Sequence, residues 1–337
     1  MAVRKLRAEL SATIKGEHPD TLRLLLATIL LATTEVSIQI FPLERKCKTN
    51  QLKGVNGNTQ GAAHCHLRAS QTIVSTTLAS TANSADQELR SFLIESYAYL
   101  TLVANITFGD DRVSYDLLMD PLLSSLEQHR PKGTYGTMMG CAHGLFELIP
   151  SICRLAHARM GGNLHGMASA ESLAQYSWLE QRIRTWTVPG NLLGGGEWFD
   201  QLSTAAYIYK YALLVFLHTA FHCSPIADDQ VISRLQPEID AIIPLALQLL
   251  PYDDPSPLAN ILLWPAIIVG SCLRHGEQQR LLQTTLTGHP FNLAITDRAA
   301  RLLGLLWNEH AEPAKPLFGP MGLQIIMEKY KINLSMA

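Results

Sequence analysis

Six cysteines are the residues whose number first suggests metal chemistry in this 337-residue chain. A binuclear zinc cluster needs six thiolates, but it draws them from one short segment that contains Cys-x-x-Cys pairs. Here no Cys-x-x-Cys pair occurs, and the closest two are Cys141 and Cys153. The spacing therefore excludes a zinc cluster from this sequence and predicts reduced, buried thiols, as in an intracellular protein. The full set is Cys47, Cys65, Cys141, Cys153, Cys223 and Cys272.

Two groups of histidines have spacings that bear on metal binding. His218 and His222 are four residues apart, a spacing that places both rings on one face of a helix and that zinc sites use. No Glu follows His218 to complete His-Glu-x-x-His, so we interpret the pair as core or boundary histidines, with a pH-sensitive contact as the alternative. In His64-Cys65-His66, successive side chains on a helix point about 100° apart, which is unsuited to one ion. We therefore predict no metal ligand in this chain.

A pair of acidic residues, Asp110-Asp111, sets up the sharpest enzyme hypothesis. Paired carboxylates supply the oxygen ligands that Mg²⁺ prefers, as in the all-α terpene synthases. No second metal motif follows downstream, and Asp-Asp after Gly109 is equally typical of a turn and helix N-cap. A terpene-synthase-like enzyme is therefore the alternative hypothesis. Aspartates that face a pocket would support it, and aspartates on a solvent-facing turn would contradict it.

Other catalytic patterns are missing from the sequence. Gly194-Gly195-Gly196 lacks the Lys-Ser/Thr of a phosphate-binding loop and is interpreted as a flexible hinge. No Gly-x-Ser-x-Gly nucleophile elbow occurs. We therefore expect a protein that is not an enzyme, with no catalytic residue and no cofactor.

The elements that must position these residues are helices. Hydrophobic residues make up 47% and charged residues 17% of the chain, which favours extensive burial over disorder. Apolar residues recur at helical spacing almost throughout, without sustained alternation. The pattern predicts an all-α fold, an irregular multi-helix bundle or α-solenoid-like array of antiparallel helices. Among the expected helices are residues 22–36, 62–82, 115–126, 137–160 with a kink at Pro150, 168–186, 197–222, 228–250, 257–275 and 292–309.

The domain organisation is expected to be simple. Residues 1–19 form a basic N-terminal arm, and residues 20–337 form one helical domain with a hinge near 189–196. The formal net charge of −2 gives no overall attraction to nucleic acid or an anionic membrane. The longest uncharged stretches contain Pro225 and Pro265 and are interpreted as buried helices rather than membrane spans.

A series of short motifs in a fixed order resembles the fungal-specific transcription factor domain, which lies C-terminal to zinc-cluster modules. The resemblance covers residues 20–310, and its most specific parts are the Leu-Trp-Pro and Leu-Phe-Glu-Leu-Ile segments. In order, the series is Leu24 to Val36, His66-Leu67-Arg68-Ala69, Ile73-Val74, Phe92-Leu93 with Tyr97 and Tyr99, Asp120-Pro121-Leu122-Leu123, Gly140-Cys141, Leu145-Phe146-Glu147-Leu148-Ile149, Ala205-Ala206-Tyr207-Ile208-Tyr209, Leu263-Trp264-Pro265, Gly270-Ser271-Cys272 and Ala299 to Trp307.

The resemblance implies a nuclear transcriptional regulator, of the kind that includes regulators of secondary-metabolite gene clusters. The DNA-contacting residues of such factors lie in the zinc cluster, so no DNA-binding residue is carried over. The domain is expected to act through protein partners of the transcription machinery or a small effector held between helices, at residues the sequence does not identify. Promoter DNA would be reached indirectly or through a module outside this chain. A homodimer and a purely scaffolding helical protein are further alternatives.

Overall fold

The computed structural model describes residues 21–38, 60–79, 87–104, 106–108, 116–129, 136, 138–161, 168–190, 196–226, 228–249, 257–288, 294–312 and 315–332. The basic arm at 1–19 and the pair Asp110-Asp111 lie outside these residues, as does most of the expected hinge near 189–196. The expected organisation, an arm followed by one helical domain, stays a prediction.

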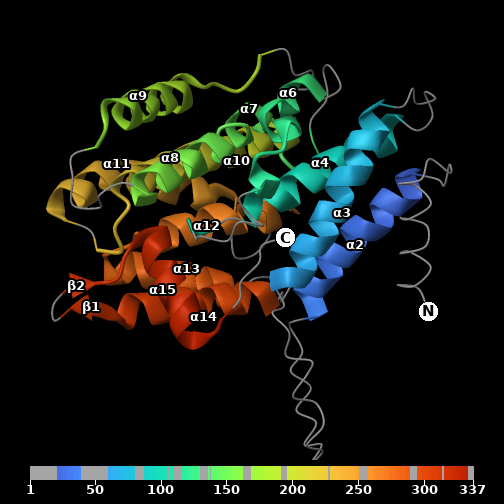
Figure 1. The fold of residues 1–337 in the computed structure, drawn as a ribbon. Coiled ribbons are helices and arrows are strands. Elements are labelled where there is room, and N and C mark those ends of the chain that lie inside the picture. Colours follow the sequence, from blue (N-terminus) through green and yellow to red (C-terminus); the bar gives the residue numbers. More distant parts are fainter. Residues whose placement is uncertain are drawn as a thin grey trace, which may run out of the picture.

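Helices make up nearly all of the described chain, so the all-α prediction is confirmed (Figure 1). The first half contains α2 (Thr21–Ile38), α3 (Gln60–Ala79), α4 (Gln87–Val103), the 3₁₀ turn η2 (Pro121–Ser124), α6 (Leu126–His129), α7 (His143–Phe146), α8 (Ile149–Gly161) and α9 (Ala170–Thr185). The second half contains α10 (Glu197–His222), α11 (Asp229–Leu249), η3 (Pro257–Leu262), α12 (Leu263–Gly270), α13 (Gly276–Thr287), α14 (Ala294–Asn308) and α15 (Gly319–Tyr330). Between α14 and α15, the short strands β1 (His310–Glu312) and β2 (Lys315–Pro316) pair antiparallel, a ribbon that helical periodicity did not predict.

The central element is α10, which contacts α7, α8, α9, α11, α12 and α15. Its sequence explains this position, because the run from Ala212 to Ala220 is buried at every residue. A helix that is apolar all round can be stable only when other helices cover every face. The succeeding helix α11 packs antiparallel against it, and α9 also packs on α10, at the top edge of the bundle in Figure 1.

A separate pair, α2 and α3, lies at the other side of the molecule and is joined to the bundle through α4 (Figure 1). Leu24, Leu25 and Leu67 are buried between these helices. Ser70 Oγ donates a hydrogen bond to Thr28 Oγ1 at 2.9 Å across the buried contact. A polar pair in an apolar contact is tolerated here because both hydroxyls are hydrogen-bonded, Thr28 also donating to a carbonyl of its own helix.

The expected helix over 137–160 is wrong at its beginning. Residues 138–142 form turns, with Gly140 at φ +56°, and the helical part is divided into α7 and α8. The cause is Glu95 on α4, whose Oε1 accepts from the backbone N–H groups of Met138 and Met139 at 2.9 and 2.7 Å. Pro150 does not kink a helix, because it is the second residue of α8, where a missing N–H costs nothing.

Two other expected helices are also divided. The one over 115–126 is broken where Asp120 caps η2, its Oδ1 accepting from Leu122 N at 3.0 Å. The one over 257–275 is a 3₁₀ turn followed by α12, which ends at Gly270. Pro265 lies in the first turn of α12, where proline fits. The turn from η3 into α12 shapes one wall of the cavity described next.

Candidate functional site: an apolar pocket

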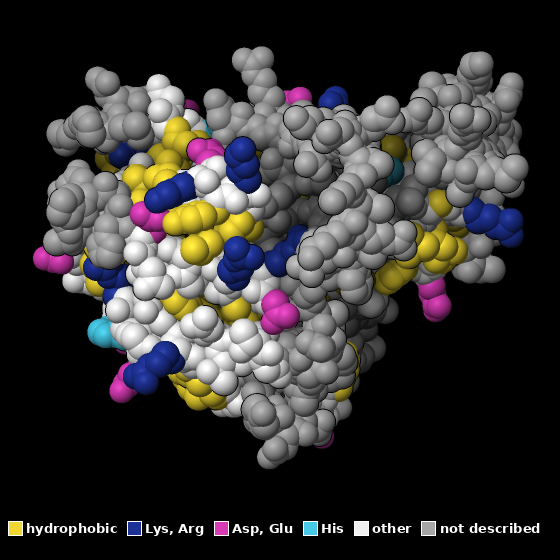
Figure 2. All heavy atoms as spheres, turned by 90° about the horizontal axis from the view of Figure 1, so that it is seen from below, with side chains coloured by type: hydrophobic (Ala, Val, Ile, Leu, Met, Phe, Trp, Pro, Cys, Tyr) yellow, Lys and Arg dark blue, Asp and Glu magenta, His cyan; other side chains and the backbone are white. Residues whose placement is uncertain are grey.

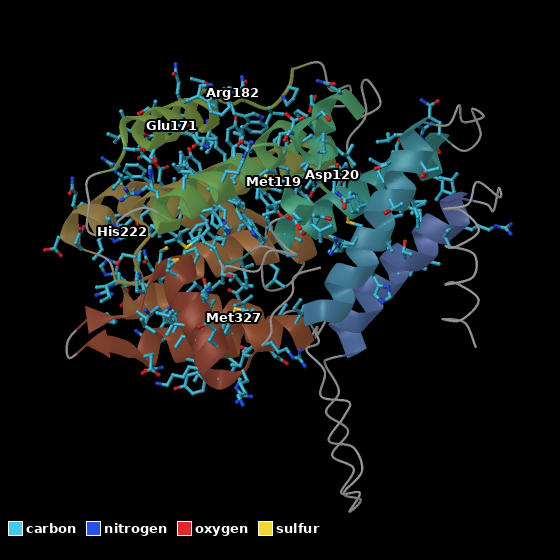
Figure 3. All side chains as sticks on the ribbon, in the orientation of Figure 1. Met119, Asp120, Glu171, Arg182, His222 and Met327 are labelled. Atoms are coloured by element: carbon cyan, nitrogen blue, oxygen red, sulfur yellow. The ribbon has the colours of Figure 1, made fainter. Side chains whose placement is uncertain are left out.

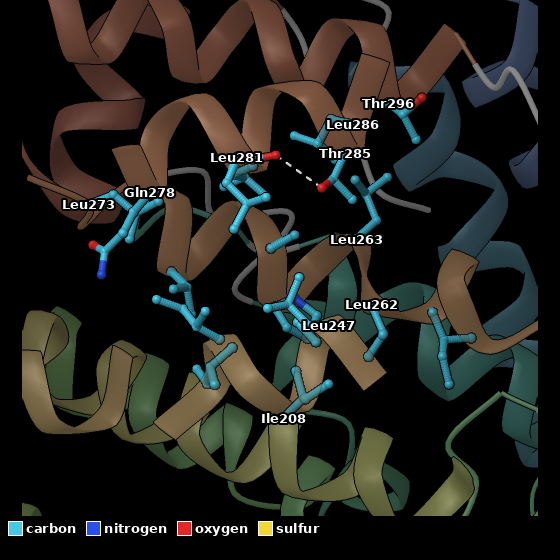
Figure 4. Close-up of a pocket in the computed structure, with 18 of the residues that line it drawn as sticks. Ile208, Leu247, Leu262, Leu263, Leu273, Gln278, Leu281, Thr285, Leu286 and Thr296 are labelled. Atoms are coloured by element: carbon cyan, nitrogen blue, oxygen red, sulfur yellow. Dashed lines mark hydrogen bonds between the residues drawn. The ribbon is translucent and has the colours of Figure 1, made fainter. Parts of the chain in front are cut away.

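A cavity of about 310 Å³ lies between α11, η3, α12 and α13, with the beginning of α14 at one side and Ile208 of α10 at its base (Figure 4). Its wall is built from aliphatic side chains of each element. Representative lining residues are Ile208, Ile242, Leu262, Val269, Leu281 and Leu286. We refer to this cavity as the apolar pocket.

The mouth of the apolar pocket is marked by residues that line it and also face solvent. Leu247 on α11 and Leu281 on α13 are 55% and 43% exposed. Large aliphatic side chains in such positions cost free energy unless something covers them. The pocket therefore opens between α11 and α13, and these two leucines border its entrance.

Polar groups at the wall are few. Thr285 Oγ1 donates to the Leu281 carbonyl of its own helix at 3.0 Å (Figure 4), so its hydroxyl hydrogen is used within α13. Gln278 also lines the pocket, as does the buried Thr296. Burial raises the pKa of Tyr99 to about 12, so its phenol stays protonated at neutral pH. These groups therefore add no charge to the wall of the pocket at neutral pH.

The wall behind the pocket is held by an aromatic cluster. Trp264 of α12 is fully buried, stacks on Tyr209 at 6.0 Å between ring centroids, and meets Phe216 edge-on at 5.4 Å. The Tyr209 hydroxyl donates to the Ile261 carbonyl of η3, which ties the 3₁₀ turn to α10. Because burial raises the pKa of Tyr209 well above its ordinary value, that donor is retained. The η3–α12 wall is therefore fixed against the central helix.

The chemistry available in the apolar pocket is binding. None of the described residues that line it is an Asp, Glu, His, Cys, Lys or Arg, and its only ionisable side chain is the buried phenol of Tyr99. The sequence carried no signal for this site, because an absence of atoms between helices has no motif. Four residues of the motif series, singled out for another reason, lie at its wall: Tyr99, Ile208, Leu263 and Pro265.

The histidine pair noted in the sequence lies elsewhere. His218 and His222 are on one face of α10 near its end, as their spacing predicts, and both line a second, smaller cavity. His218 is buried, and desolvation lowers its pKa to about 4, so the ring is neutral at pH 7. Within the described residues, no group of three His, Cys, Asp or Glu side chains is arranged to hold a metal ion.

The other residues singled out in the sequence are the cysteines, the glycine triplet, the aspartate pair and His64-Cys65. The four described cysteines, Cys141, Cys153, Cys223 and Cys272, are buried free thiols, and burial raises the pKa of each of the last three. Gly196 adopts φ +123° as the residue before α10, whereas Gly194 and Gly195 lie outside the described residues. Asp110 and Asp111, the basis of the enzyme alternative, lie outside them too, as do the side chains of His64 and Cys65.

In the part of the chain that the structure describes, no helix combines the length and hydropathy needed to cross a bilayer. No curated protein and no solved structure matches the chain. A family model does match: the fungal-specific transcription factor domain, over residues 1–309. Because that match covers most of the sequence, the chain belongs to the fungal-specific transcription factor domain family, a family of transcriptional regulators.

Proposed function

We propose that this protein is a regulatory domain that controls transcription in response to a small apolar effector bound in the apolar pocket. The observation that carries the proposal is a pocket of about 310 Å³ with an uncharged, largely aliphatic wall. Ligand sites in proteins are commonly apolar clefts of about this size with a few polar groups. The effector class that fits is an aliphatic or aromatic metabolite with at most one or two neutral hydrogen-bonding groups.

The binding step would be coupled to regulation through the helices that border the mouth. An effector covering Leu247 and Leu281 favours the arrangement in which α11 and α13 stand close together. A ligand shifts a conformational equilibrium only by its difference in affinity for the two states. Separation or approach of α11 and α13 is such a difference, because it changes the apolar area that the ligand buries.

The place of action that agrees with the family is the nucleus. DNA contact would come from a partner or from a module outside this chain, and proteins of the transcription machinery would bind one arrangement of the helices in preference to the other.

We further propose that the regulated genes belong to a secondary-metabolite cluster, so that the effector is an apolar product or intermediate. Deleting the gene in a fungus that carries it should lower or raise the transcripts of one cluster together. Unchanged cluster transcripts would refute this part of the proposal.

The binding step is tested with the fluorescent apolar probe N-phenyl-1-naphthylamine. The intact chain should enhance its fluorescence saturably, and Ala246→Phe, which places a ring in the pocket, should abolish the enhancement. The matched control is Ala158→Phe on the exposed face of α8, which should bind the probe like the parent protein. Equal binding by both variants would place the probe elsewhere and overturn the proposal.

A further inference from the structure

A second cavity, of about 190 Å³, lies at the opposite end of the α10–α11 pair from the apolar pocket. It is formed where α10 ends and α11 begins, with Arg159 of α8 at its side. Figure 3 labels His222 at this place, on the side of the molecule away from α2 and α3. We refer to it as the polar cavity; its wall includes Arg159, His218, Phe221, His222, Asp228 and Arg234.

The feature that demands an explanation is Nε2 of His218. The residue is only 3% exposed, and this nitrogen is buried without a hydrogen-bond partner among the described residues. The other ring nitrogen, Nδ1, lies 2.9 Å from the Tyr176 hydroxyl. A buried polar nitrogen left unpaired costs about 1–3 kcal/mol, so a partner in the cavity would stabilise the site.

Neighbouring hydrogen bonds decide which nitrogen carries the hydrogen. Arg234 Nη1 donates to the Tyr176 oxygen at 3.0 Å, so the Tyr176 hydroxyl hydrogen is free to point to another acceptor. His218 Nδ1 lies 2.9 Å from this hydroxyl, whereas the hydrogen bond of Glu180 to Tyr176 has the smallest effect on the tyrosine, and we infer that the hydrogen points to Nδ1. The neutral imidazole then carries its hydrogen on Nε2. The charged groups that act on His218 are Glu180, Arg234 and Arg184, and desolvation by burial outweighs them. The unpaired Nε2 is therefore a donor, and its missing partner is an acceptor.

Two guanidinium groups at the wall add donors and charge. Arg159 uses Nε to donate to the Phe221 carbonyl at 3.1 Å, and Arg234 uses Nη1 for Tyr176. The Nη groups of Arg159 and Nη2 of Arg234 have no hydrogen bond to a described residue. The side chains of Arg159, Arg234 and Asp228 together carry one net positive charge. Phe221 and Val231 give the cavity an apolar surface beside these donors.

We propose that the polar cavity binds a small organic monocarboxylic acid, whose carboxylate accepts from His218 Nε2 and the guanidinium groups of Arg159 and Arg234. Guanidinium groups match the planar carboxylate with paired hydrogen bonds, and one net positive charge suits a monoanion better than a dianionic phosphate. The organic part packs on Phe221 and Val231. This site is separate from the apolar pocket and does not depend on the function proposed for it.

The test uses the full chain labelled with ¹⁵N at histidine, the His218 signal being assigned by its loss in His218→Gln. Benzoate serves as the carboxylate probe, benzamide as its neutral isostere and inorganic phosphate as the competing anion. Benzoate should shift the His218 Nε2 signal saturably, and benzamide should leave it unchanged. An equal response to benzamide, tighter binding of phosphate, or no response to any of the three, as for a cavity that holds only water, would overturn the proposal.

Variants locate the site. Arg159→Gln and Arg234→Gln should each weaken benzoate binding at least about tenfold, the loss expected for one charged hydrogen bond. The matched control is Arg154→Gln, on the same helix as Arg159, whose hydrogen bond goes to Ser151 Oγ, away from the cavity. It should bind like the parent. Ala246→Phe should also leave the benzoate response intact, which separates a failure here from a failure at the apolar pocket. If Arg154→Gln weakens benzoate binding as much as the cavity variants do, the site is wrong. If a variant does not fold, the comparison of benzoate with benzamide on the parent protein still tests the proposal.

Discussion

The two ends of the α10–α11 pair solve the same packing problem in opposite ways. At one end, aliphatic side chains surround the apolar pocket without a charged group in its described wall, and the space needs no polar partner. At the other end, Arg159, His218 and Arg234 surround the polar cavity, where a buried nitrogen does need one. An apolar void can stay dry, whereas a polar one must be filled by water or ligand. The first end therefore selects by shape and buried area, and the second by charge and hydrogen bonding.

The side chains that set this contrast come from helices that run through both ends. Along α10, Ile208 faces the apolar pocket and His218 the polar cavity, and along α11 the corresponding residues are Ile242 and Arg234. Two prolines, Pro237 and Pro244, lie inside α11 between or near these positions. Each removes a backbone donor from the helix, so α11 is the element of the pair with the weaker internal hydrogen bonding.

The largest effect is expected from breaking the wall of the apolar end. Trp264→Ala deletes a fully buried ring that contacts Tyr209 and Phe216, and we expect unfolding to become easier by about 3–5 kcal/mol. Chemical denaturation followed by circular dichroism measures the change. The control is Trp178→Ala on α9, a ring that is 51% exposed, with an expected change within about 0.5 kcal/mol. Similar losses for the two variants would show that the η3–α12 wall is not held by this cluster.

At the polar end, we expect His218 to make the free energy of unfolding depend on pH. The pKa of His218 is about 4 when folded against an ordinary 6.5, so the unfolded chain binds more protons between these values. Stability is therefore full above pH 6.5 and falls by about 3 kcal/mol as the pH is lowered through the folded pKa. Urea denaturation at a series of pH values measures it, and His218→Gln should lack this component. Parallel pH profiles for the parent and the variant would contradict the assignment.

The contrast between the ends also shows where sequence reasoning succeeds. The bounds of α10 follow from its apolar run, its Gly residues before Glu197 and the sequence after His222, all of which are local signals. The shared face of His218 and His222 follows from helical spacing. The partners of His218 do not, because Tyr176 and Arg234 reach it from other helices. Local spacing cannot reveal which distant side chains meet, nor that Glu95 captures the N–H groups of Met138 and Met139 and prevents a helix there.

A smaller effect is expected at the middle of α11, between the two ends. Glu238 is buried and its Oε1 lies 2.8 Å from Nη2 of Arg184 at the end of α9. Glu238→Gln should cost roughly 1–2 kcal/mol, less than a fully buried ion pair, because Arg184 is 46% exposed and water can replace its partner. The control is Asp240→Asn on the exposed face of α11, whose carboxylate contacts Gln236. Equal costs would show that burial of Glu238 adds nothing.

The smallest effect compares two helix ends that stop in the same backbone conformation but with different surroundings. Cys223 ends α10 at φ +50° and Lys331 ends α15 at φ +51°, a left-handed conformation that costs an L-residue about 1 kcal/mol or more. Glycine relieves that cost, although its greater freedom in the unfolded chain cancels part of the gain. Lys331 is exposed, so Lys331→Gly should stabilise the protein by about 0.5 kcal/mol.

Cys223 differs because its side chain is buried beside the polar cavity, with Sγ 3.9 Å from the Ala156 carbonyl. Cys223→Gly loses that burial, and the loss of roughly 1 kcal/mol offsets the relief of backbone strain. We therefore expect Cys223→Gly to be neutral or slightly destabilising while Lys331→Gly stabilises, measured as opposite shifts of the thermal midpoint in parallel melts. If Cys223→Gly stabilised the protein, the backbone strain at Cys223 would cost more free energy than the burial of its side chain contributes. In that case the less stable end of the α10–α11 pair would be the one beside the polar cavity, not the one beside the apolar pocket.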